Sequence, residues 1–250
     1  MQLIASLVIA FSTYSRIPMP RVQWSDENRR YALCFFPLIG LAAGALMGLW
    51  LWLCRKLALG AFLQGTVAAA IPLLVTGGIH MDGFMDTCDA LASWQPPEKR
   101  LEILKDSHIG AFAALWCGVY LLAMAGLYSE CTPRDALPLA ACFVLSRALS
   151  AILSVACGQA RPGGMLDSFS RAAAGKAVKA CGFMYALAAA AILAARGAWP
   201  ALPAALGVVL YYRHMSAKYF GGVTGDLAGW FLQVCELLCA AAVVLGGKLL

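Results

Sequence analysis

Long apolar runs dominate this 250-residue chain and constrain its fold more than any other feature. Several approach the roughly 20 residues that a helix needs to cross a bilayer. They cover residues 31–53, 57–75, 109–128, 136–157, 177–195, 198–212 and 227–247. In lipid every backbone polar group needs a partner, which a helix supplies within one segment. We therefore expect an all-α, polytopic integral membrane helix bundle of about seven spans.

Composition supports a membrane location. Only 13% of the residues are charged, 62% are hydrophobic and mean hydropathy is +0.75, whereas about a quarter of residues are charged in soluble domains. No polar segment is long enough for a separate soluble domain, so one membrane-embedded domain over 1–250 is expected. The ten cysteines lack any Cys-x-x-Cys pair, which favours buried thiols over a disulfide framework.

The first fourteen residues, MQLIASLVIAFSTY, are apolar but short for a full crossing. They lack the charged n-region and the small-residue cleavage site of a signal peptide. We predict a short N-terminal helix that is retained and lies at the membrane interface.

The charged residues gather on one side of the predicted bundle. Under the seven-span count, segments 15–30, 76–108, 158–176 and 213–226 share a side, and they hold most of the 19 Lys and Arg residues. The positive-inside rule makes this side cytoplasmic. Most of the 13 acidic residues lie there too. Charges of both signs on one side favour a polar active site over a set of cations that only fixes the membrane topology.

One acidic segment, HMDGFMDTCDA at 80–90, stands out in this apolar chain. Asp82, Asp86 and Asp89 are spaced i, i+4 and i+7, which puts them on one face of a helix. Carboxylates that share a small volume raise one another's pKa values or recruit a cation. Oxygen ligands favour Mg²⁺, which commonly serves phosphate chemistry. A solvated acidic face is the alternative, and the membrane border favours the metal site.

A fourth carboxylate is expected to join this trio. Pro96-Pro97 breaks the helix, and the following segment restarts one. If the two halves fold back as a hairpin, Asp106 returns to the level of the trio, with Lys105 and His108 close by.

Two further polar segments are candidates on the same side. The basic loop 158–176 contains Arg161, which would either clamp phosphate or anchor the topology. Asp226 follows Gly221-Gly222 with the spacing that separates Gly77-Gly78 from Asp82. The repeated spacing predicts two similar turns at the membrane edge.

Arg147 and Glu236 fall inside predicted spans. Charges are costly in lipid, so both are expected to face the bundle interior. They would either pair there or line the substrate cavity. His80, at the start of the acidic segment, is more often structural in such a position.

The acidic segment also carries a family resemblance. TGGIHMDGFMDTCDALAS at 76–93 and RLEILKDSHIGAFAA at 100–114 closely resemble the cobalamin synthase family, the adenosylcobinamide-GDP ribazoletransferases. The shorter pieces that agree in order are SRIPMP at 15–20, FFPLIGLAAGALMG at 35–48, SR at 146–147, and GGVTGD at 221–226 with Glu236 beyond it. The resemblance covers nearly the whole chain. His108 is a departure, because arginine is frequent there in the family.

The resemblance implies the last step in assembling the nucleotide loop of vitamin B12. Adenosylcobinamide-GDP would react with α-ribazole or its 5′-phosphate and release GMP, in a Mg²⁺-dependent enzyme of the cytoplasmic (inner) membrane whose active-site loops face the cytoplasm. Asp82, Asp86 and Asp89 would hold the metal, and Asp106 would complete the metal shell or act as general base. The substrate-binding candidates are Arg16, Lys105, His108, Arg147, Arg161, Asp226 and Glu236.

Two other functions compete with this interpretation. A CDP-alcohol phosphotransferase is also embedded in the membrane and Mg²⁺-dependent, but D-x-x-x-D-x-x-D differs from its D-x-x-D-G-x-x-A-R pattern. An ion-coupled transporter would place its acids near the midplane, whereas most acids here lie at one face. Lipid is the expected surrounding and nucleic acid is not an expected partner. Homo-oligomerisation stays open.

Overall fold

The computed structural model describes residues 2–249, and these residues form helices without any strand, as predicted. The elements are α1 (Gln2–Tyr14), α2 (Asp26–Arg29), α3 (Ala32–Lys56), α4 (Ala61–Thr76), α5 (Ile79–Ala92), α6 (Pro97–Ile103), α7 (Ala111–Ser129), the 3₁₀ turn η1 (Pro133–Asp135), α8 (Ala136–Ala156), α9 (Met165–Ala172), α10 (Gly175–Ala195), α11 (Ala201–Phe220) and α12 (Gly225–Leu249).

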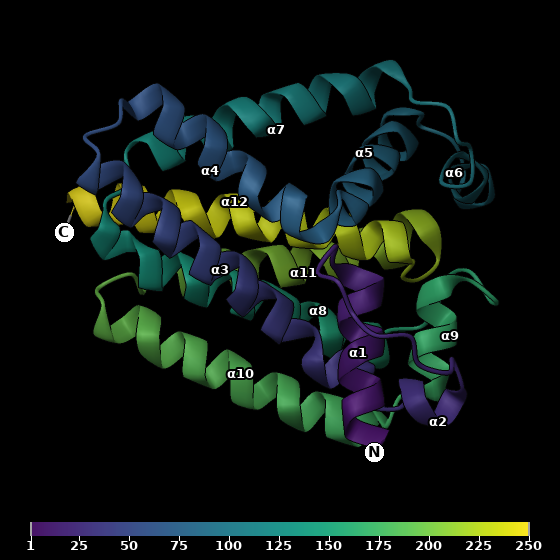
Figure 1. Ribbon diagram of the computed structural model, residues 1–250. Helices are drawn as coiled ribbons and strands as arrows, with labels where there is room; N and C mark the ends of the chain where they lie inside the picture. The colour runs from purple at the N-terminus through teal and green to yellow at the C-terminus, as the bar shows by residue number, and fades with distance from the viewer. Residues whose placement is uncertain (1, 250) are drawn as a thin grey trace.

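The long helices α3, α4, α7, α8, α10, α11 and α12 run along one bundle (Figure 1). Small residues let neighbouring backbones approach closely. A Cβ atom on Gly40 of α3 would lie 2.3 Å from the Phe143 carbonyl oxygen of α8, and one on Gly44 would lie 2.5 Å from the Ala140 Cβ. Such small-residue contacts are typical of helix packing in lipid, where burial of apolar surface supplies little driving force.

The expected count of about seven spans is not confirmed. All seven predicted segments are helical, but five of the described helices are long and apolar enough to cross a membrane alone. A sixth is added if α4 and α5, which meet at a bend of 99°, count as one broken span. α11 falls outside this set, and its C-terminal half carries Arg213, His214 and Lys218.

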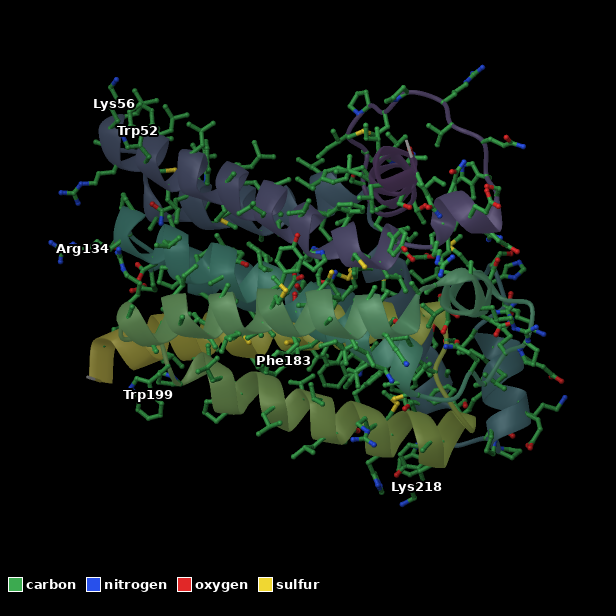
Figure 2. The ribbon with its side chains drawn as sticks, turned by 90° about the horizontal axis from the view of Figure 1, so that it is seen from below. Trp52, Lys56, Arg134, Phe183, Trp199 and Lys218 are labelled. Atoms are coloured by element: carbon green, nitrogen blue, oxygen red, sulfur yellow. The ribbon has the colours of Figure 1, made fainter. Side chains whose placement is uncertain are left out.

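The polar connections gather at one end of the bundle. Helices α2, α5, α6 and α9 all lie at this end, and α1 crosses the bundle beside them (Figure 1). Figure 2 places Lys218 at this end and Trp52, Lys56, Arg134 and Trp199 at the other. The structure thus brings together the four polar segments that the charge pattern assigned to one side.

α1 is too short to cross a bilayer and packs sideways on the bundle. Ile9 and Ala10 are buried with Phe169 of α9, whereas Leu3 and Ile4 are exposed. An apolar helix buried on one face and exposed on the other fits the predicted interfacial position.

This arrangement makes a prediction about membrane topology. Reporters fused after residues 100, 168 and 220 should all report the cytoplasm, because these positions share the polar end, and a fusion after residue 132 should report the opposite side. Alkaline phosphatase and fluorescent-protein fusions measure this. The same compartment for the fusions at 100 and 132 would contradict the arrangement.

Candidate active site

Two glycine turns build the polar end of the bundle. α4 ends at Gly77 (φ +67°), and Asp82 lies in the first turn of α5. α11 ends at Gly221 (φ +72°), and Asp226 lies in the first turn of α12. Glycine adopts these left-handed conformations without strain from a Cβ atom. The prediction of two similar turns is confirmed: each ends one helix and starts another that carries an aspartate.

The helices that follow these turns pack closely. A Cβ atom on Gly83 of α5 would lie 2.6 Å from the Asp226 carbonyl oxygen, and one on Gly229 of α12 would lie 2.7 Å from the His80 carbonyl oxygen. The first turns of α5 and α12 are therefore side by side. Helix N-termini present unpaired N–H groups and a positive dipole end, so this junction favours anions such as phosphate.

Negative charge accumulates at the junction. α5 lies at the polar end of the bundle (Figure 1) and is not one of the five described helices that are long and apolar enough to cross a membrane alone. Partial burial, together with the charges of Asp82, Asp226 and Asp89, raises the pKa of Asp86 to about 7. The carboxylates thus repel one another, and the positive groups of the protein do not fully offset this repulsion. A bound cation would reduce it.

Asp89 has a structural partner that its spacing did not reveal. Its Oδ2 accepts a hydrogen bond from the Gly110 N–H at 2.7 Å, and its Oδ1 accepts one from the Ala113 N–H at 2.9 Å. These donors belong to the N-terminus of α7, so Asp89 caps that helix from α5. Its assignment as a metal ligand stays a prediction.

The cap predicts a loss of stability on substitution. Asp89→Ala should destabilise the protein by about 1–2 kcal/mol, because two N–H groups of α7 lose their acceptor. Asp89→Asn should cost less, since one side-chain oxygen remains. Thermal unfolding of detergent-purified protein measures both, with Asp26→Ala as a control because that side chain is 80% exposed. Equal unfolding temperatures for Asp89→Ala and the wild type would contradict the cap.

Three adjoining cavities share the aspartates of the junction. Asp82 and Arg16 line one of about 560 Å³. Asp82 and Asp226 both line a second, of about 280 Å³. Asp226 and Arg161 line a third, of about 230 Å³. We call this set the aspartate cleft: Asp82 and Asp226 lie in its middle, Arg16 lies at one end, and Arg161 lies at the other end with Asp167.

Backbone contacts hold Arg16 at its end of the cleft. Its N–H donates to the Val75 carbonyl at 2.8 Å, which ties the segment after α1 to the end of α4. A Cβ atom on Gly77 would lie 2.2 Å from the Arg16 Nε, so the side chain lies directly over this turn. Glycine at position 77 therefore allows the left-handed turn and also leaves the space that the Arg16 side chain occupies.

Arg161 is held by pairing between two loops. The Ala160 N–H donates to the Val223 carbonyl at 3.0 Å, and the Val223 N–H donates to the Gly158 carbonyl at 2.8 Å. Arg171, the other arginine of this loop, pairs with Asp167 at 2.9 Å. Arg161, rather than Arg171, is therefore the arginine of this loop that lines the cleft beside Asp226.

Lys105, Asp106 and His108 lie apart from the cleft in this conformation. Asp106 accepts hydrogen bonds from the His108 N–H at 3.0 Å and pairs with the ring at 2.7 Å, contacts that lower the pKa of Asp106. Arg100 of α6 is buried 4.8 Å from the Tyr219 ring centroid, which anchors this helix on α11. Asp106 is not among the charges that act on Asp86. The roles assigned to these three residues stay predictions.

Arg147 and Glu236 form a buried ion pair. Nη1 of Arg147 lies 2.6 Å from Oε1 of Glu236, and both side chains are at most 2% exposed. The prediction that they face the interior is confirmed, and of the two alternatives left open there the structure shows the pair. Neither lines the aspartate cleft, so a substrate-binding role stays a prediction.

The site suits a cation held jointly with a substrate rather than a closed metal cage. Among residues 2–249, no three His, Cys, Asp or Glu side chains are grouped so that they could hold one metal ion. Mg²⁺ is usually bound by one or two carboxylates, with waters and substrate phosphates completing its shell. Asp82 and Asp226 supply hard oxygens of this kind beside two arginines, and this pair of carboxylates fits Mg²⁺ with a diphosphate.

The fold and the cleft define a polytopic helical membrane protein with a site suited to phosphate groups. The family model for cobalamin-5-phosphate synthase matches residues 6–244. The chain therefore belongs to the cobalamin-5-phosphate synthase family.

Relatives carry the name adenosylcobinamide-GDP ribazoletransferase. One from Lachnoclostridium phytofermentans is 41% identical, with 98% of this chain and 95% of the relative covered. One from Desulfitobacterium hafniense is 34% identical, with 93% of each covered. One from Clostridium perfringens strain 13 is 30% identical, with 91% of this chain and 92% of the relative covered. No solved structure matches the chain.

Proposed function

We propose that this protein transfers an adenosylcobinamide phosphate group from adenosylcobinamide-GDP to α-ribazole or its 5′-phosphate. A ribose hydroxyl oxygen attacks the phosphorus on the corrinoid side, and a P–O bond forms there. In α-ribazole 5′-phosphate this is not the 5′ oxygen, which already carries the phosphate. The P–O bond to the GMP phosphate breaks, and GMP leaves with the bridging oxygen. The proton of the attacking hydroxyl is released to a base or to water. This is the late nucleotide-loop assembly step of cobalamin biosynthesis.

One observation carries the proposal: Asp82 and Asp226 are shared by adjoining cavities whose ends are formed by Arg16 and Arg161. A diphosphate needs positive charge along its length while its central bond breaks. The two arginines and the N-termini of α5 and α12 supply it. Family membership and the names of the relatives support the same reaction.

The proposed role of each residue follows from its position in the aspartate cleft. Arg16 and Arg161 would bind the diphosphate oxygens from opposite ends and orient the phosphorus toward the nucleophile. Asp82 and Asp226 would hold Mg²⁺, which when bound supplies charge neutralisation to the phosphates, and Asp86 would add negative charge beside them. Asp106 would enter as general base only if the segment after α6 moves toward the cleft.

The location follows from the charge pattern. We place the protein in the cytoplasmic membrane with the aspartate cleft facing the cytoplasm, since the polar end holds most of the cations. Adenosylcobinamide-GDP and the nucleoside would then reach the cleft from the cytoplasm.

Purified protein in detergent tests the function directly. With Mg²⁺, adenosylcobinamide-GDP and α-ribazole, we expect GMP in equal amount to the joined corrinoid product. Omission of α-ribazole should abolish GMP release. Release of CMP from a CDP-alcohol, with no GMP from the corrinoid substrate, would contradict the proposal.

A further inference from the structure

The cavity of about 280 Å³ in the aspartate cleft differs in character from its neighbours. It extends from Asp82 and Asp226 into the bundle, between α1, α3, α5, α8, α9 and α12. Its wall contains Tyr14, Phe36 and His80. An apolar cavity of about 150 Å³ accommodates benzene, so this one has room for two fused rings.

His80 provides an independent sign of a ligand. The residue is 5% exposed and lines this cavity, yet its Nε2 atom has no hydrogen-bond partner among residues 2–249. The ring is held between Tyr14, at a centroid distance of 6.3 Å, and Phe36, at 5.6 Å. Buried polar atoms are nearly always paired, so an orphan atom in a rigid aromatic setting suggests a partner that comes with the ligand.

We propose that this cavity, which we name the base cavity, binds the flat aromatic heterocycle of the nucleoside substrate. The Nε2–H of His80 donates a hydrogen bond to a ring nitrogen, while Tyr14 and Phe36 contact the ring system. The base of α-ribazole is a fused two-ring benzimidazole with one unsubstituted nitrogen, which is a hydrogen-bond acceptor. This inference rests on the proposed function and specifies where its nucleophile binds.

The position of the base cavity agrees with the direction of attack. Asp82 and Asp226 line its cleft end. A riboside whose base lies beside His80 would therefore extend its ribose toward the two aspartates and the diphosphate. Ser150 and Ser154 of α8 also line the cavity. Their hydroxyl groups would therefore be able to contact polar substituents of the ligand.

A binding experiment tests the inference without relying on turnover. Equilibrium dialysis with Mg²⁺ measures the affinity of the detergent-purified full-length protein for radiolabelled α-ribazole, and unlabelled ribosides compete. The informative competitor is the α-riboside of dimethylindole, in which C–H replaces the free ring nitrogen. We expect the wild type to bind it about tenfold more weakly than α-ribazole, since it cannot accept the His80 hydrogen bond.

Variants assign the preference to His80. His80→Phe keeps an aromatic ring but removes the donor, so it should bind both ribosides equally. His80→Gln restores an N–H donor and should recover part of the preference. His214→Phe is the matched control, because His214 is exposed on α11 and does not line the cleft; it should behave as the wild type.

The outcomes separate this inference from the proposed function. Equal binding of the two ribosides by the wild type would overturn the inference even if GMP is released. A change in KM for adenosylcobinamide-GDP, rather than for α-ribazole, in His80→Phe would also overturn it, because guanine would then occupy the cavity. A retained tenfold preference without GMP release would support the inference and overturn the proposed reaction.

Discussion

Asp82→Asn should lower the rate of GMP release by about 10²–10³-fold, a loss of the size seen when one group that stabilises transition-state charge is removed. Asp82 lines both the cavity of Arg16 and the base cavity. Asparagine keeps the shape and removes the charge that would hold Mg²⁺ against the diphosphate. The side chain is exposed and forms no ion pair with another residue of the described part of the chain, so folding should be unaffected.

The measurement compares initial rates over a range of Mg²⁺ concentrations. Asp226→Asn should give a similar loss, and the double variant should lose less than the two single effects combined, because residues that act as one unit are not additive. Asp26→Asn, an exposed aspartate away from the aspartate cleft, is the control. Full activity in both single variants would remove the carboxylates from the mechanism and leave α5 with a solvated acidic face.

Local spacing predicted some parts of this site well. The i, i+4, i+7 pattern placed the acidic trio on one helix, and the repeated Gly-Gly-x-x-x-Asp spacing identified two turns that each begin with a left-handed glycine and lead to an aspartate in the next helix. Both depend on contacts within one turn or one helix, which sequence records directly.

The contacts that sequence reasoning missed are long-range. Asp89 caps α7 through donors 21 and 24 residues away, and nothing in its helical spacing distinguishes it from Asp86. The pairing of Gly158 and Ala160 with Val223 selects Arg161 over Arg171 for the cleft. Only the close packing of α5 on α12, through Gly83 and Gly229, makes Asp226 a neighbour of Asp82.

The predicted hairpin that would bring Asp106 to the acidic trio also depends on a long-range contact. The acidic helix α5 already ends at Ala92, before the two prolines, and α6 starts at Pro97 as expected but spans only Pro97–Ile103. The buried contact of Arg100 with Tyr219 then ties this helix to α11. The hairpin prediction used only the local sequence on either side of the two prolines, so it did not include this tertiary contact.

Arg147→Met should be the most destabilising single substitution proposed here. It leaves the Glu236 carboxylate buried without its 2.6 Å partner, and loss of one member of a buried ion pair typically costs about 3–5 kcal/mol. The Arg147 side chain also donates to the Phe143 carbonyl at 3.0 Å, which would lose that bond. Thermal unfolding in detergent measures the loss, and Glu236→Leu should give a loss of similar size.

The double variant Arg147→Met, Glu236→Leu decides what the pair is for. Apolar side chains replace both charges, so no isolated charge remains and most of the lost stability should return. If the pair only joins α8 to α12, the KM values for adenosylcobinamide-GDP and α-ribazole should then be near those of the wild type. A stable double variant with a greatly raised KM would instead show that one of these charges reaches a substrate. That outcome would require the interior to open beyond the aspartate cleft, since neither residue lines it in this conformation.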